Sequence, residues 1–169
     1  MIEWGLFSAS WPQYAAGLWL TLQLTVFALA AGLVCAIPLA VLRVSPNPWV
    51  HGPVWLYGYF FRGTPMLVQL LLMYYGLGQF EWMQTQWADG NRLWLVLRDP
   101  YGCALLTFAL NTCAYTTEIL AGALRATPHG EIEAARACGM SRFTMLRRIL
   151  LPGAFRRALP AYSNEIIFM

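Results

Sequence analysis

Two charged side chains interrupt long apolar segments of this 169-residue chain. Arg62 is the only charged residue of 54–80, and Glu118 is the only one of 101–124. A charge in such surroundings is costly to bury, so it is a functional candidate by default. A guanidinium at position 62 could guide a substrate carboxylate. A carboxylate at position 118 could bind a cationic side chain or an α-amino group.

Uncharged polar residues accompany both charges. Asn111 and Tyr115 fall in the helical turns before Glu118, and Gln69 follows Arg62. Together, these side chains predict a substrate pathway lined by Arg62, Gln69, Asn111, Tyr115 and Glu118. A structural reading stays open beside it: the polar groups would form interhelix hydrogen bonds, and Glu118 would pair with an arginine such as Arg62 or Arg125.

A basic loop follows the second of these segments. Residues 125–157 contain seven arginines and two glutamates. Thr127 is predicted to cap a short helix that starts with Pro128, while Gly139 suits a sharp turn. Ser141 would cap a second helix that ends at Pro152. The pattern indicates two short helices on either side of a bend, either docked on a protein or resting on anionic lipid headgroups.

The elements that position these residues are predicted to be membrane-spanning helices. The chain is 59% hydrophobic and 11% charged, against roughly 25% charged residues in average globular proteins. Residues 15–42, 54–80 and 101–124 are each long enough to cross a bilayer, and a fourth span is expected from Leu159. Eleven residues from there reach only half of a bilayer. We therefore expect an all-α polytopic membrane domain over 1–169, cut within its fourth span and continued in a longer protein.

Arginine placement predicts the orientation. Residues 1–14 carry no arginine, and 81–100 carry two against three acids. The turn after the first span has Arg43, and the basic loop has seven arginines. The positive-inside rule therefore places the N-terminus and 81–100 outside the membrane, and the basic loop in the cytoplasm.

Four segments resemble the membrane subunit of polar amino-acid ABC importers. They are FRGTPMLVQLL at 61–71, LNTCAYTTEI at 110–119, PHGEIEAARACG at 128–139 and LPAYSNE at 159–165. The resemblance is greatest to M-type subunits of histidine / lysine-arginine-ornithine permeases. It implies a type I importer permease bundle of five spans in a bacterial inner membrane, with a periplasmic N-terminus.

The resemblance also implies partners and a docking site. The partners are an ATP-binding subunit dimer, a second homologous permease subunit, a periplasmic solute-binding protein and membrane lipid. The basic loop would then be the cytoplasmic loop that couples to the ATP-binding subunit. Its coupling residues would be Glu131, Glu133, Ala134, Ala135, Gly139 and Pro152. The cargo would be histidine or a cationic amino acid, with another polar amino acid such as glutamine as the alternative.

Other function classes receive little support. The sequence has no nucleophile elbow, no HExxH and no GxxxxGK[ST], so we expect no enzyme activity and no ATP site in this chain. The four scattered cysteines and two histidines do not predict a metal site or a cofactor. No soluble basic stretch is interleaved with aromatics, which disfavours nucleic acid as a partner. An intramembrane protease and a non-transporting structural subunit are the rival hypotheses.

Overall fold

The computed structural model describes residues 4–168, and every regular element in that range is helical. The long helices are α1 (Trp4–Arg43), α2 (Pro48–Gly63), α6 (Pro100–Arg125) and α9 (Leu151–Phe168). Shorter ones are α3 (Met66–Leu71), α4 (Glu81–Ala88), α5 (Arg92–Leu95), α7 (His129–Ala137) and α8 (Arg142–Met145). The π-helical segments η1 (Leu72–Gly76) and η3 (Leu146–Leu150) and the 3₁₀ turn η2 (Leu77–Gln79) complete the fold. The all-α prediction is confirmed.

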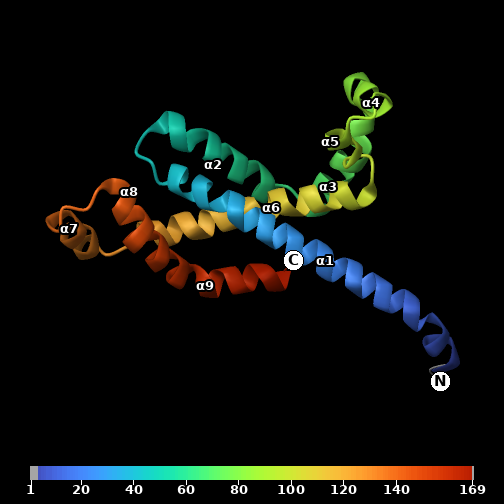
Figure 1. Cartoon of the computed structure of the whole chain (residues 1–169), viewed down its shortest axis with the longest axis horizontal. Helices are drawn as coiled ribbons and strands as arrows, with labels where there is room; N and C mark the ends of the chain where they lie inside the picture. The colour runs from blue at the N-terminus through green and yellow to red at the C-terminus, as the bar shows by residue number, and fades with distance from the viewer. Residues whose placement is uncertain (1–3, 169) are drawn as a thin grey trace.

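The core lies where α1, α6 and α9 meet, and small side chains dominate it. Ala36 and Ala40 of α1 pack into one buried cluster with Ala121 of α6 and with Ala154 and Ala158 of α9. Small residues let helix backbones approach closely, which is how helices associate where lipid replaces water. Helix α6 runs through the middle of the molecule, with α1 and α9 beside it (Figure 1).

Within the described residues, two helices are long and apolar enough to cross a membrane. They are Ser10–Arg43 and Pro100–Arg125, whose most apolar 18-residue windows have mean hydropathies of 2.4 and 1.2. They correspond to the first and third predicted spans. The large hydrophobic side chains Trp19, Val26 and Val34 of α1 are more than half exposed, as expected of a surface that faces lipid or another subunit.

The second predicted span is not one continuous helix. Helix α2 begins earlier than expected, because Asn47 accepts a hydrogen bond from the Trp49 amide at 3.0 Å and Pro48 occupies the first turn. It ends at Gly63, and Thr64 is extended, as a residue before proline prefers. Helix α3 then starts after Pro65. The second predicted span, 54–80, is therefore divided between α2 and α3 at the FRGTP segment.

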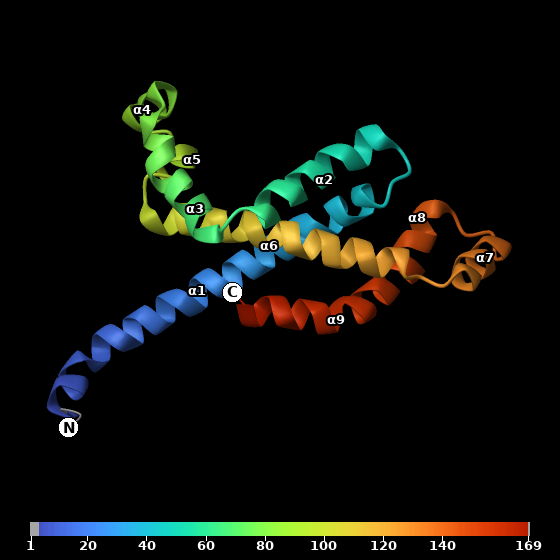
Figure 2. The same cartoon turned by 180° about the vertical axis from the view of Figure 1, so that it is seen from behind.

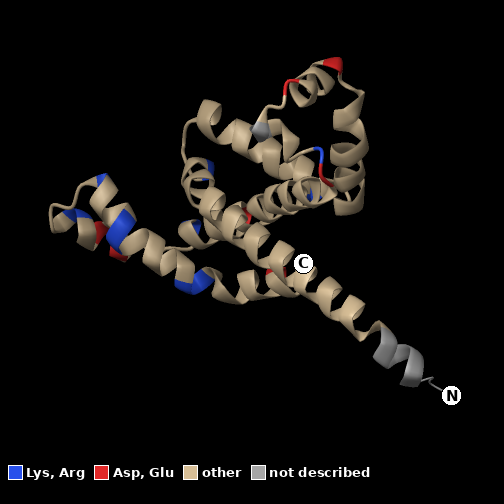
Figure 3. Ribbon diagram, turned by 45° about the vertical axis from the view of Figure 1, so that its right-hand side comes forward, with Lys and Arg blue, Asp and Glu red and all other residues tan. Residues whose placement is uncertain are grey.

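The two polar loops lie at opposite ends of the bundle (Figures 1 and 2). Helices α4 and α5 sit at the N-terminal end of α6, where the Trp87 indole donates to the Trp94 carbonyl at 2.8 Å. Helices α7 and α8 lie at the other end, on the same side as the turn between α1 and α2. Figure 3 shows blue arginines gathered around this second end. The arrangement agrees with a topology in which the two basic segments share one side of the membrane.

We predict that this side is the cytoplasm. A membrane-impermeant thiol reagent should label Asp89→Cys in intact cells and Ser141→Cys only after permeabilisation. Because the native chain has four cysteines, including the exposed Cys35 and Cys138, the labels belong on a variant with all four replaced by alanine. The reverse labelling pattern would overturn the orientation and the assignment of the docking loop.

Candidate functional site

The break between α2 and α3 is held together by Gln69. Its Nε2 lies 2.8 Å from the Phe61 carbonyl oxygen, 3.0 Å from the Thr64 carbonyl oxygen and 2.6 Å from Thr64 Oγ1. Its Oε1 accepts a hydrogen bond from Asn111 Nδ2 at 3.2 Å. A helix that ends inside a membrane leaves carbonyls without partners, and the buried Gln69 amide supplies donors for them. Gln69, supported by Asn111, thus stabilises the break between α2 and α3.

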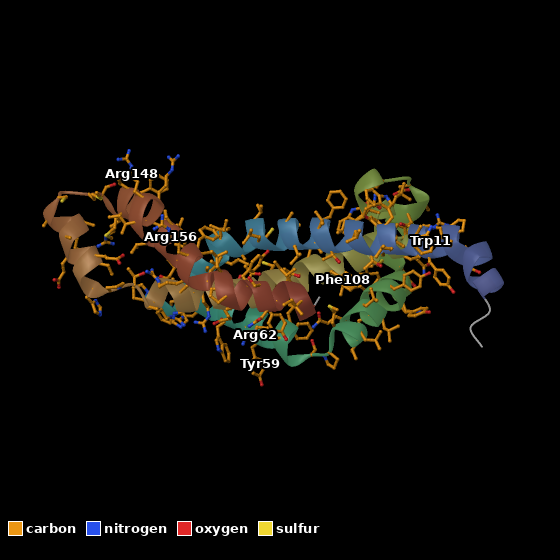
Figure 4. All side chains as sticks on the ribbon, turned by 90° about the horizontal axis from the view of Figure 1, so that it is seen from below. Trp11, Tyr59, Arg62, Phe108, Arg148 and Arg156 are labelled. Atoms are coloured by element: carbon orange, nitrogen blue, oxygen red, sulfur yellow. The ribbon has the colours of Figure 1, made fainter. Side chains whose placement is uncertain are left out.

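A cavity of about 540 Å³ opens next to this break. Its lining includes Arg62 and the extended Thr64-Pro65 segment, Asn111 and Tyr115 of α6, and Glu165 of α9. The Arg62 Cζ atom lies 5.6 Å from the centre of the Tyr115 ring, a cation–π distance. Figure 4 shows Arg62 on α2, at the edge of the helix bundle. The cavity therefore combines a cation, a carboxylate, a phenol and an amide.

Glu165 is the residue that sequence reasoning left out of the pathway. Its signal was an acid in the final apolar segment, but nothing in the sequence indicated which helix it would face. The structure places it on the same cavity as Arg62, Asn111 and Tyr115, three of the five predicted pathway residues.

Glu118 lies apart from that cavity and is paired. Arg43 Nε donates to Glu118 Oε1 at 2.6 Å, and the two side chains are 14% and 19% exposed. The partner is neither Arg62 nor Arg125, the two arginines considered from the sequence; Arg125 instead donates to the Arg43 carbonyl at 3.2 Å. Both Arg43 and Glu118 line a second cavity of about 240 Å³, which also includes Arg62. The Arg43–Glu118 ion pair thus connects the C-terminal end of α1 to α6.

The basic loop folds into the predicted two helices with a bend at Gly139. The φ angle of Gly139 is +71°, in the left-handed region. Its amide donates to the Arg136 carbonyl at 2.9 Å, and the Met140 amide donates to the Ala135 carbonyl at 3.1 Å. These two bonds form a Schellman motif, which satisfies the last carbonyls of α7 and favours glycine at this position. The predicted turn is confirmed.

The other residues predicted to couple to an ATP-binding subunit differ in their exposure. Glu131, Glu133 and Ala134 lie on the exposed surface of α7, whereas Ala135 is only 2% exposed. Glu131 lies in the first turn, where a negative charge interacts favourably with the helix dipole. Ala135 thus anchors α7, while the glutamates remain available to a partner.

Two details of the loop bear on the predicted caps. Thr127 does not cap α7, since Pro128 occupies the N-cap position and no side chain caps the helix, so that prediction was wrong. Ser141 does cap α8, because its Oγ accepts from the Thr144 amide at 3.3 Å.

Pro152 does not end the second helix, contrary to the prediction. The chain stays helical from Arg142 through η3 into α9. Proline removes one amide donor from a helix. The wider π-helical turn of η3 lies immediately before it, and the helix continues past the proline without ending.

A family model for the binding-protein-dependent transport system inner membrane component matches residues 28–169. The octopine transport system permease protein OccM of Rhizobium meliloti is 49% identical over 154 residues, which cover 91% of this chain and 61% of that protein. The histidine/lysine/arginine/ornithine transport system permease protein HisM of Escherichia coli K12 is 50% identical over 154 residues, covering 90% and 63%. This chain thus spans less than two thirds of the length of these relatives.

Solved structures agree with the fold. One described as an amino acid ABC transporter with histidines superposes with a TM-score of 0.79 at 30% identity, over 100% of this chain and 72% of that chain. The MetNI methionine ABC transporter in inward-facing conformations gives a TM-score of 0.75 at 21% identity, over 99% and 72%. This second likeness supports the fold alone. The predicted resemblance is confirmed, and the chain belongs to the family of binding-protein-dependent transport system inner membrane components.

Proposed function

We propose that this chain forms part of the transmembrane pathway of an ATP-driven importer of polar amino acids. The observation that carries the proposal is the cavity beside the broken helix, lined by Arg62, Asn111, Tyr115 and Glu165. An amino acid carries a carboxylate and an ammonium group, and losing water from both requires opposite charges or dense hydrogen bonding in the pathway. Arg62 would receive the carboxylate and Glu165 a cationic side chain.

The energy would come from another subunit. Helices α7 and α8 form a basic, bent surface with the exposed glutamates Glu131 and Glu133, which suits docking on an ATP-binding subunit dimer. A second permease subunit and a periplasmic solute-binding protein would complete the importer, in a bacterial inner membrane. The alternative for this loop, contact with anionic lipid headgroups, explains the arginines but requires neither the glycine turn nor the buried Ala135.

Histidine and the cationic amino acids lysine, arginine and ornithine are the first candidates for cargo. The similarity to HisM permeases supports them, and the acid in the cavity favours a cationic side chain. The similarity to OccM is as strong, so octopine is the second candidate. Another polar amino acid such as glutamine is the further alternative. A structural subunit that transports nothing would not need a polar cavity of this volume.

The test is uptake by the complete permease complex in proteoliposomes, with histidine, lysine, arginine, ornithine, glutamine and octopine as substrates. Arg62→Gln should lower uptake of all of them about tenfold, because each carries a carboxylate that loses a charged partner. Glu165→Gln should lower uptake of lysine and arginine about tenfold and that of glutamine much less. The control is Glu81→Gln, which removes an exposed acid of α4 away from the cavity. Equal uptake by all three variants would contradict the assigned pathway.

A further inference from the structure

The two ends of the basic loop are fastened to each other by Arg157. This arginine lies on α9, and its Nη2 donates to Thr127 Oγ1 at 2.7 Å. Its Nε donates to the Ala123 carbonyl at 3.2 Å. Thr127 is 5% exposed and directly precedes the N-cap residue of α7. One guanidinium therefore reaches both the end of α6 and the first residues of the loop.

The carbonyl of Ala123 needs such a partner. In a continuing helix it would accept from the amide four residues later, that of Thr127. The Thr127 amide bonds instead to the Leu124 carbonyl at 3.2 Å. The last carbonyls of a helix attract cations both as acceptors and through the helix dipole. Arg157 thus caps the C-terminus of α6 from a different helix.

The surroundings leave space for this arginine. A Cβ atom placed on Gly153, one turn earlier in α9, would lie 3.2 Å and 3.3 Å from the two terminal nitrogens of Arg157. Ala154 and Ala158, on the same helix, are buried in the core against α6. The small residues bring α9 close to α6, and the absence of a side chain at Gly153 lets the guanidinium lie across the gap.

The hydrogen bond between Arg157 and Thr127 brings the two ends of the basic loop together. From Thr127 the chain passes through α7, the Gly139 turn and α8, and then enters α9 without a break in the helix before it returns to Thr127 at Arg157. We propose that Arg157 is a positioning residue that fixes the orientation of the basic loop relative to α6 and α9. A movement of α7 would then move α6 and α9 together. This inference rests on the proposed function, in which α7 docks on an ATP-binding subunit.

The experiment compares matched variants in the complete permease complex in proteoliposomes, and measures amino-acid uptake and ATP hydrolysis together. Thr127→Val removes the acceptor with little change of shape, and Thr127→Ser retains the hydroxyl. Arg157→Gln removes the charged donor, and Arg156→Gln removes the adjacent arginine, which is exposed. We expect Thr127→Val and Arg157→Gln to lower the substrate transported per ATP hydrolysed about tenfold, with assembly and basal hydrolysis retained. Thr127→Ser and Arg156→Gln should keep the ratio of the unmodified complex.

A double variant separates this contact from a general loss of stability. Because both changes remove the same hydrogen bond, Thr127→Val combined with Arg157→Gln should lower the ratio no further than Arg157→Gln alone. Independent, multiplying losses, or an unchanged ratio in both single variants, would overturn the positioning role while leaving the proposed function intact. Failure of the unmodified complex to import any amino acid on ATP would contradict the proposed function itself, and this inference with it.

Discussion

Gly139→Leu is expected to reduce coupled transport strongly while the chain still inserts into the membrane. A leucine at a φ of +71° costs about 1–2 kcal/mol, and relief of that strain would dismantle the Schellman turn between α7 and α8. The position has open space, since a Cβ atom added there would meet nothing within 4 Å, so the cost comes from the backbone and not from a clash. We expect at least about a tenfold loss of uptake per assembled complex, measured with ATP hydrolysis on the same proteoliposomes.

Two controls isolate the backbone effect. Gly139→Asn should retain most of the uptake, because asparagine tolerates the left-handed region. Gly130→Leu places the same side chain on the exposed surface of α7, where φ is negative and space is again open, and should cost much less. Glu133→Lys, which reverses an exposed charge without changing the fold, tests docking itself and should also uncouple hydrolysis from uptake. Normal transport by both Gly139→Leu and Glu133→Lys would favour a loop that rests on lipid.

Glu118→Gln is expected to reduce the amount of assembled permease. Removing one partner of a fully buried ion pair costs about 3–5 kcal/mol, and the partial exposure of Arg43 and Glu118 brings our expectation to about 2 kcal/mol. The unpaired Arg43 would destabilise the junction between α1 and α6 whatever the substrate. Total uptake should then fall by the same factor for arginine, lysine and histidine, in proportion to the amount of assembled permease quantified in the membrane.

The partner variant provides the matching test. Arg43→Gln combined with Glu118→Gln leaves no unpaired charge, so assembly should recover toward the level of the unmodified chain. Glu118 would instead be a substrate contact if Glu118→Gln assembled normally and lost more uptake of arginine and lysine than of histidine.

Short sequence motifs predicted much of the backbone structure of the basic loop. The glycine turn and the Ser141 cap each depend on residues within a few positions, and both were confirmed. Helix content and the positions of the first and third spans follow from composition and segment length, which need no knowledge of packing. The break at Thr64-Pro65 could be anticipated as a distortion, but its extent depends on Gln69, whose amide replaces the missing helical bonds.

Contacts between distant residues could not be predicted in this way. Arg43 and Glu118 are 75 positions apart, and the sequence had suggested Arg62 or Arg125 as the partner of that acid. Only the packing of α1 on α6 selects among them. Glu165 joins the cavity for the same reason, since α9 must fold back along α6 before Glu165 can lie near Arg62. Thr127 had a plausible local role as a cap, and a contact from α9 takes its hydroxyl instead.

The continuous helix from α8 through η3 into α9 restricts the number of residues in this part of the chain more tightly than it restricts their types. In a flexible connection, one added or lost residue would be absorbed locally. Here one residue inserted between Met145 and Leu151 would rotate α8 by about 100° relative to α9. The exposed Phe143 would then face a different direction from the docking surface, while each helix by itself remained intact. Homologues should therefore vary in residue type across this segment and yet preserve the number of residues between the Gly139 turn and Arg157.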